Sequence, residues 1–238
     1  MKLDIFSYRF AEEITQHQRH NNAWNEIRMI LEKAPLFIYP KKSGKNPHLD
    51  VVQQLMNTYF DRVFVLDHGW DFHPLATNIV NSGLKADYRK KFGDLVIQAE
   101  VQFGNMSRWY SDVFKFQAAY SQAMIKLGLS VIPSSSLARR IDSNIVNFER
   151  AKKELPSAEL SLTLPILMIG LDTDQKTEIV DVSKCQFQNI RDITGMDKSD
   201  NQWRIINSYL AGMRMEDIGS DTPIGQTIDV QLDSDSEE

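Results

Sequence analysis

The sequence predicts an α/β fold in which a mixed central β-sheet contains an antiparallel hairpin and a βαβ crossover and is flanked by helices. Two observations carry this prediction. Residues 84–103 form two strand-like arms around Gly93-Asp94, and glycine at the first central position suits a two-residue type II′ turn. Helical spacing over 109–127 then leads into the apolar stretch 129–133. A strand, a helix and a second strand in this order make part of the sheet parallel.

The segment before the hairpin predicts two helices. Apolar residues recur at three- and four-residue steps over 23–34, directly after Asn21-Asn22, and an asparagine there can cap the helix N-terminus. Residues 49–59 predict the second helix. The segment RVFVLD at 62–67 predicts a short strand or a helix-to-loop transition.

The segment after the hairpin predicts alternating helices and strands. The helix over 109–127 is expected to end at Gly128, because glycine is favoured just beyond a helix C-terminus. The remaining expected elements are a helix within 139–153, a buried strand LPILMIGL at 164–171, a strand at 178–183 and a helix at 201–213.

Charge divides the chain into a body and a tail. The chain has 238 residues, 42% of them hydrophobic, and a formal net charge of −5. Eight of the 32 acidic residues lie in 216–238, which has no lysine or arginine, so residues 1–215 are mildly basic. We expect one domain over 1–215 and a flexible, solubilising acidic tail over 216–238. A tail that competes with DNA for a basic cleft is the alternative.

The cysteine count and the apolar runs predict a cytoplasmic protein without a membrane partner. Cys185 is the only cysteine, which excludes an internal disulfide and a cysteine-based zinc site and suits a reducing compartment. The N-terminus lacks the apolar core of a signal peptide. The longest apolar run, 162–171, contains Pro165 and is too short to span a membrane.

The predicted hairpin places polar residues on one face. Its turn sets Asp87 opposite Glu100 and Arg89 opposite Gln98. Opposed carboxylates repel unless a cation lies between them, and a hard divalent ion such as Mg²⁺ favours such oxygen ligands. The alternative is an amphipathic hairpin in which Glu100 pairs with Arg89 or Lys85, and spacing alone favours this alternative.

A resemblance to a known family favours the metal site over the simple ion pair. The string AEVQFGN at 99–105, with Asp87-Tyr88 on the facing arm and an aromatic-rich helix after it, resembles the active-site core of the BglII and BstYI restriction endonucleases. That family belongs to the PD-(D/E)xK nuclease superfamily, with glutamine in place of the usual lysine. The segments MKLDIFSYRFAEEI, WNEIRMILEKAPL and LPILMIGLD are similar to other parts of the family.

The resemblance implies a Mg²⁺ site and names its residues. Asp87, Glu100 and the backbone carbonyl of Val101 would bind the ion, and Gln102 would hold the attacking water. Asp87 lies further from Glu100 than the family spacing, and Asp94 lies closer. We prefer Asp87, because lengthening both arms of a hairpin equally keeps opposed residues opposed.

The resemblance also implies contacts with double-stranded DNA. The family positions that read bases correspond to Asn105, Asp142, Ser143 and Asn144. Asparagine can bind adenine and aspartate can accept from cytosine in the major groove. The alternative for residues 142–144 is a helix N-cap. Two further residues, Arg139 and Arg140, can contact phosphates, although a basic helix is often only solvated.

The function implied is that of a type II restriction endonuclease, a site-specific deoxyribonuclease that cleaves a short palindrome, with a site containing GATC suggested by the family. Two-fold site symmetry implies a homodimer. A cognate DNA methyltransferase is implied functionally rather than as a bound partner. The alternatives are a sequence-specific DNA-binding protein without cleavage activity and a protein-interaction domain with an acidic tail.

Overall fold

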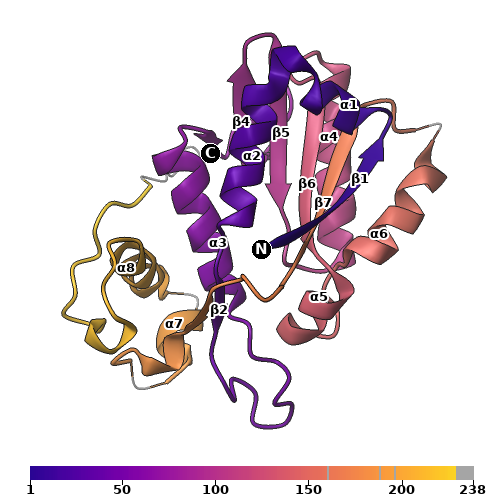
Figure 1. The fold of residues 1–238 in the computed structure, drawn as a ribbon. Helices are drawn as coiled ribbons and strands as arrows, with labels where there is room; N and C mark the ends of the chain where they lie inside the picture. Colours follow the sequence, from indigo (N-terminus) through magenta and orange to yellow (C-terminus); the bar gives the residue numbers. More distant parts are fainter. Residues whose placement is uncertain (160, 188, 196, 229–238) are drawn as a thin grey trace.

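A six-stranded mixed sheet lies at the centre of the computed structural model, which describes residues 1–159, 161–187, 189–195 and 197–228 (Figure 1). The strand order is β1-β7-β6-β5-β4-β3. The strands are β1 (Lys2–Tyr8), β3 (Asp71–Phe72), β4 (Tyr88–Phe92), β5 (Leu95–Val101), β6 (Leu127–Pro133) and β7 (Ile166–Asp172). Strands β5, β6 and β7 are parallel, whereas β1 and β4 pair antiparallel with them. The predicted α/β class with a mixed sheet is confirmed.

Helices cover both faces of this sheet, and a small second sheet lies beside it (Figure 1). The helices are α1 (Ala11–Gln16), α2 (Asn21–Glu32), α3 (Gln53–Asp61), α4 (Met106–Ser121), α5 (Ser135–Ile141), α6 (Phe148–Glu154), α7 (Arg191–Thr194) and α8 (Ser199–Leu210). The second sheet pairs β2 (Leu36–Ile38) in parallel with β8 (Ile179–Asp181), so the strand expected at 178–183 lies outside the central sheet.

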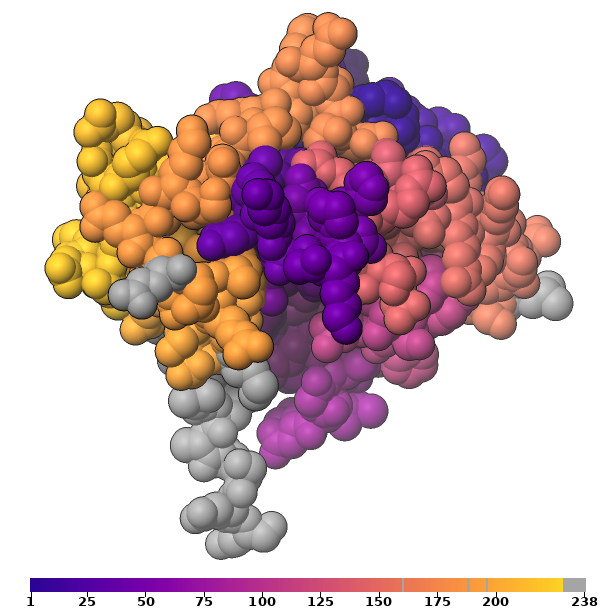
Figure 2. All heavy atoms as spheres, turned by 90° about the horizontal axis from the view of Figure 1, so that it is seen from below, coloured from indigo at the N-terminus to yellow at the C-terminus, as the bar shows by residue number. Residues whose placement is uncertain are grey.

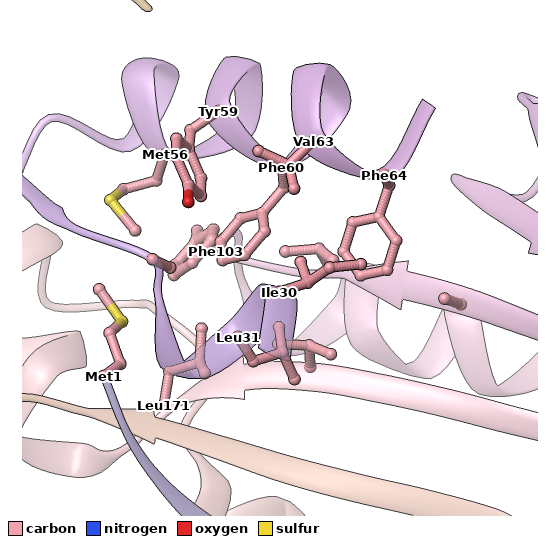
Figure 3. Close-up of a cluster of buried hydrophobic side chains, with 14 of the residues drawn as sticks. Met1, Ile30, Leu31, Met56, Tyr59, Phe60, Val63, Phe64, Phe103 and Leu171 are labelled. Atoms are coloured by element: carbon pink, nitrogen blue, oxygen red, sulfur yellow. The ribbon is translucent and has the colours of Figure 1, made fainter. Parts of the chain in front are cut away.

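Two hydrophobic clusters hold the helices to the sheet. One face of β5 packs under α2 and α3, where Phe60, Phe64 and Phe103 are buried (Figure 3). On the other face, α4 buries Trp109 and Phe116. Because α4 covers the second face as well, the polar residues of β5 are buried beneath a helix rather than solvated.

The hairpin has the register that the sequence predicts. Arg89 pairs with Gln98, and Phe92 pairs with Leu95. Gly93 has a φ of 62°, as the first central residue of a type II′ turn requires. The crossover is also confirmed, because β5, α4 and β6 follow one another and β5 is parallel to β6.

The start of α2 differs from the prediction. The residue before α2 is His20, and Asn21 and Asn22 lie inside the helix. A short 3-10 helix, Gln18–His20, runs directly into α2. The chain therefore does not become extended at the asparagines, which a side-chain cap at this position would require.

The segment 62–67 is not a strand. It continues α3 as a π-helical segment, Arg62–Asp67, which buries Val63 and Phe64 in the core (Figure 3). The strand alternative of the sequence prediction is therefore wrong here. An apolar run of this length fits a buried helical end as well as a strand.

The ends of α4 also differ from those expected. Asn105 caps the helix N-terminus through a hydrogen bond from the Arg108 amide, and the helix ends at Ser121. Gly128 lies inside β6 instead of closing the helix. A Cβ atom on Gly128 would lie 2.9 Å from the Phe116 ring, so close packing of α4 on the sheet explains this glycine.

The segment 139–153 contains two helices rather than one. Helix α5 ends at Ile141, and α6 begins at Phe148 after the N-cap Asn147. Residues 142–144 therefore lie in the connection between the helices. The N-cap alternative for these three residues is wrong, because Asn147 performs that role.

The C-terminal segment is attached to the body beyond residue 215. Ile218 is buried, the Arg204 side chain donates to the Thr222 carbonyl, and Asn207 donates to the carbonyls of Ile224 and Gln226 at 2.7 and 2.8 Å. These contacts extend to Gln226, so the residues just after 215 are not the free tail that the sequence analysis expects. Residues 229–238, the rest of the expected tail, lie outside the described residues. Among the described residues, no helix is long and apolar enough to cross a membrane.

Candidate active site

Two carboxyl groups meet where the hairpin ends. Asp87 directly precedes β4, and one of its oxygens accepts a hydrogen bond from the Val101 amide at 2.9 Å. Val101 directly follows Glu100 in β5, and the Asp87 and Glu100 carboxyl groups are close enough to influence each other's pKa. The extended arms therefore bring Asp87 to Glu100, as the predicted register requires.

The environment disfavours ionisation of both groups. Burial raises the pKa of Asp87 to about 6, and the charge of Asp112 adds to this effect. Burial also raises the pKa of Glu100 well above its usual range, with the charges of Asp87 and Asp112 as further causes. Such a pair binds either a proton or a metal cation more readily than it stays fully ionised and unpaired.

Asp94 lies far from this pair along the hairpin. It occupies the turn, its side chain is 65% exposed, and it contacts His20 and Lys126 at 3.1 and 3.4 Å. Hydrogen bonds from His20 and Lys126 lower its pKa. The geometry favours Asp87 over Asp94 as the partner of Glu100.

Gln102 is held in one orientation beside the carboxylates. Its side-chain NH₂ group donates to Asp112 Oδ2 at 2.9 Å, and its carbonyl oxygen accepts from the Gly104 amide at 2.7 Å. The two contacts determine which end of the amide is the donor. Val101 and Gln102 follow Glu100 directly, so the three residues lie at the same end of β5.

Two residues that the sequence analysis missed complete this cluster. Asp112 and Lys115 both lie on α4, and the Lys115 ammonium is 2.8 Å from Asp112 Oδ1 and 2.8 Å from Glu100 Oε2. These carboxylates raise the pKa of Lys115 despite the opposing effect of burial. The sequence holds a signal for Asp112, which lies three residues after Trp109 and four before Phe116 and so shares their buried helix face; Lys115 lies at the edge of that face.

A second polar chain reaches Glu100 from within the sheet. Arg89 donates to Gln98 Oε1 at 2.9 Å, which turns the Gln98 NH₂ group toward Glu100 Oε1 at 3.4 Å. Arg89 also donates to the Leu75 carbonyl. The alternative prediction that Arg89 pairs directly with Glu100 is therefore not observed; the fully buried Gln98 lies between them.

The donor set fits a hard divalent cation. The carboxyl oxygens of Asp87 and Glu100, with the backbone carbonyl of Val101 adjacent in sequence, supply oxygen ligands of the kind that such ions prefer. No cluster of three or more His, Cys, Asp or Glu residues suited to a metal ion occurs in the described part of the chain. Two carboxyl groups and one carbonyl are fewer ligands than a hard divalent ion takes, so an ion held here would keep positions open for water or a phosphate.

The predicted base-reading residues lie next to this site. Asn105 forms an isolated bridge with Ile145, and the Val146 amide donates to the Gly104 carbonyl at 2.9 Å. The connection between α5 and α6 therefore lies against the end of β5. A polar pocket of about 380 Å³ opens there, lined by Asn105, Met106, Ser107, Ser143, Asn144, Ile145, Asn147 and Arg150.

The predicted DNA-contact residues are exposed but differ in the hydrogen bonds that their side chains already make. Asp142, Ser143 and Asn144 are exposed, although the Asp142 carboxylate accepts from the Ser143 amide and hydroxyl. Asn105 is exposed, but its side-chain oxygen caps α4. Its NH₂ group is the part of the side chain that can read a base.

The two predicted phosphate contacts also differ. Arg139 is exposed. Arg140 instead forms a bidentate ion pair with Asp50 at 2.9 and 2.8 Å. This pair fastens the loop after β2 to α5. Seen from below, that loop (purple) stands between the salmon segments around α5–α6 and the orange segment that contains α7 (Figure 2).

The chain matches a family of restriction endonucleases over most of its length. Residues 3–171 match the family described as Restriction endonuclease BglII/BglIII, and the chain belongs to that family. It is accordingly a type II restriction endonuclease, a site-specific deoxyribonuclease, and restriction endonucleases of this kind generally use divalent metal ions. The resemblance found in the sequence is confirmed.

Solved structures agree with the fold. The restriction endonuclease BglII complexed with a DNA 16-mer is 23% identical, with a TM-score of 0.58, over 74% of this chain and 79% of that chain. Free BglII is 19% identical, with a TM-score of 0.51, over 74% and 82% of the two chains. No curated protein matches the chain.

Proposed function

We propose that this enzyme is a cytoplasmic homodimer that uses Mg²⁺ to cut both strands of double-stranded DNA at a short palindrome. A site containing GATC is our working choice, by analogy with the family. A cognate DNA methyltransferase would protect the host DNA. The observation that carries the catalytic part is the hydrogen bond from the Val101 amide to Asp87, which places this carboxyl group at the end of β5 that also holds Glu100 and precedes Gln102.

The proposed mechanism assigns one task to each residue. Asp87, Glu100 and the Val101 carbonyl would hold Mg²⁺. The bound ion would supply a water of lowered pKa and offset charge that develops on the phosphodiester. Gln102, fixed by Asp112 and the Gly104 amide, would orient the attacking water.

The proposed DNA contacts follow the pocket beside the site. Asn105, Ser143 and Asn144 share its lining, and Asp142 lies next to them on the exposed connection. Arg139 is our proposed phosphate contact. We do not propose that role for Arg140, because its guanidinium is engaged by Asp50. Base readout by asparagine and aspartate suits the major groove.

The main argument for the alternative, a protein that binds DNA without cleaving it, does not apply to this structure. It required the lengthened hairpin to carry Asp87 away from Glu100, yet Asp87 accepts a hydrogen bond from the amide of Val101, the residue directly after Glu100. The nuclease function is therefore the better supported one.

Digestion of unmethylated phage DNA with Mg²⁺ tests the proposal. Wild-type protein should give discrete fragments whose sequenced ends define the site. Asp87→Asn and Glu100→Gln should each lower cleavage by at least about a hundredfold, because each loses a charged ligand of the proposed ion. Asp94→Asn, a matched change at the exposed turn, should cut like wild type. Equal loss in Asp94→Asn and Asp87→Asn, or an inactive wild type, would contradict the assignment.

A further inference from the structure

Lys115 forms a buried ion cluster that the proposed mechanism leaves unused. Its ammonium contacts Glu100 Oε2 and Asp112 Oδ1, both at 2.8 Å. The Lys115 side chain is 14% exposed, and those of Glu100 and Asp112 are 1% and 4% exposed. Burying three charges is costly, so their arrangement at the reacting end of β5 calls for a function beyond stability.

A bound divalent ion would affect the two contacts of Lys115 differently. Glu100 is a proposed ligand of the divalent ion, so the ammonium occupies an oxygen for which that ion would compete. Asp112 is not a proposed ligand, and its other oxygen accepts from Gln102. If Lys115 releases Glu100, Asp112 still holds the ammonium beside Gln102.

We propose that Lys115 is a catalytic residue that neutralises Glu100 in the metal-free enzyme and, once a divalent ion takes Glu100, stays on Asp112 to bind the reacting phosphate. This inference rests on the proposed function. Gln102 orients water but carries no charge, so β5 supplies no side-chain cation next to Glu100 from its polar face. Lys115 supplies that charge from the helix.

The proposed contribution is electrostatic and leaves the lysine protonated. The water oxygen bonds to phosphorus and gives up a proton to solvent. The bond from phosphorus to the 3′ oxygen breaks, and the departing oxygen takes up a proton from solvent. The products are a 5′-phosphate and a 3′-hydroxyl. The Lys115 ammonium stabilises the added negative charge on the phosphate oxygen throughout.

The test compares Lys115→Met with Lys126→Met in the full-length chain. Lys126 is a suitable control because its ammonium pairs with the exposed Asp94, at the turn end of the hairpin and away from Glu100. Mn²⁺ binding without DNA is measured by electron paramagnetic resonance. Single-turnover cleavage of phage DNA is measured at saturating Mg²⁺.

We expect Lys115→Met to bind Mn²⁺ about tenfold more tightly, because a competing cation close to the ion is removed. We also expect cleavage to fall by about a hundredfold or more. A purely structural role would weaken both properties together. Weaker or unchanged Mn²⁺ binding, or cleavage at the wild-type rate, would overturn the inference.

A measurement on wild-type protein covers the case in which Lys115→Met does not fold. The ¹⁵N signal of the Lys115 ammonium, assigned with Lys115→Arg, should shift when Mg²⁺ is added. A signal that does not move at saturating Mg²⁺ would refute the exchange from Glu100. Failure of the proposed function itself is distinguishable, because wild-type protein would then neither bind Mn²⁺ nor cut DNA.

Discussion

Asp61 links the stability of the metal-free enzyme to pH. It is the last residue of α3, and the Tyr88 hydroxyl donates to its Oδ1 atom at 2.6 Å. Burial raises the pKa of Asp61 from 3.8 to about 7, against the opposing effect of the Tyr88 hydrogen bond, and the charge of Asp87 raises it further. Asp61→Asn keeps an oxygen acceptor for Tyr88 but removes the charge.

The sign and size of the effect follow from proton linkage. With a pKa of about 7, native Asp61 holds a proton over a range where the unfolded state has lost it, so the contribution of Asp61 to stability falls as pH rises from about 4 to about 7. The pKa difference of about three units corresponds to roughly 4 kcal/mol in full, of which about 2 to 3 kcal/mol is lost between pH 5 and pH 8. Asp61→Asn has no carboxyl group at this position, so it should not lose these 2 to 3 kcal/mol of stability between pH 5 and pH 8.

Urea unfolding at pH 5 and pH 8 in the presence of a chelator measures the difference. The gap between wild type and Asp61→Asn should grow by about 2 kcal/mol in favour of the variant as pH rises. Asp94→Asn is the control, because the lowered pKa of Asp94 places its titration below this range. An Asp61→Asn protein with the same pH dependence as wild type would refute the assignment.

Two glycine substitutions test packing and orientation. Gly170→Ala should lower stability by about 1 to 3 kcal/mol in thermal or urea unfolding, because a Cβ atom added to Gly170 in β7 would lie 2.6 Å from the Cγ atom of Phe148 in α6; an unchanged stability would contradict this packing. Gly104→Ala should lower cleavage by about tenfold or more with little loss of stability, because its Cβ would collide with the Gln102 side-chain oxygen. Wild-type cleavage by Gly104→Ala would show that this orientation of Gln102 is not needed.

The hairpin could be predicted because local rules determine it. Gly93 fixes the turn type, and the turn fixes which residues face each other along the arms. The strict two-residue period of strands then separates apolar from polar positions on β5. These rules are sufficient to set Asp87 opposite Glu100 from the amino-acid sequence alone.

The features of the fold and site that the sequence did not predict depend on contacts between segments that are distant along the chain. Lys115 reaches Glu100 only because α4 packs on β5, and helical spacing alone cannot show which polar residue of a helix meets which strand. The strand β1 depends on pairing with β7, which lies far along the chain. The attachment of residues near Ile218 likewise depends on contacts with α8 and its neighbours.

The charges of the site argue for a divalent ion independently of the family. Asp87, Glu100 and Asp112 bring three carboxyl groups to the cluster, and Lys115 brings one ammonium. If all four are ionised, these side chains together carry a net charge of −2, which equals in size the charge of one divalent cation. Without such an ion, burial favours retention of a proton, which is the direction in which the pKa values of Asp87 and Glu100 move. We therefore expect ion binding at the proposed site to release protons and Mn²⁺ binding to weaken as pH falls below about 6, the pKa to which burial raises Asp87.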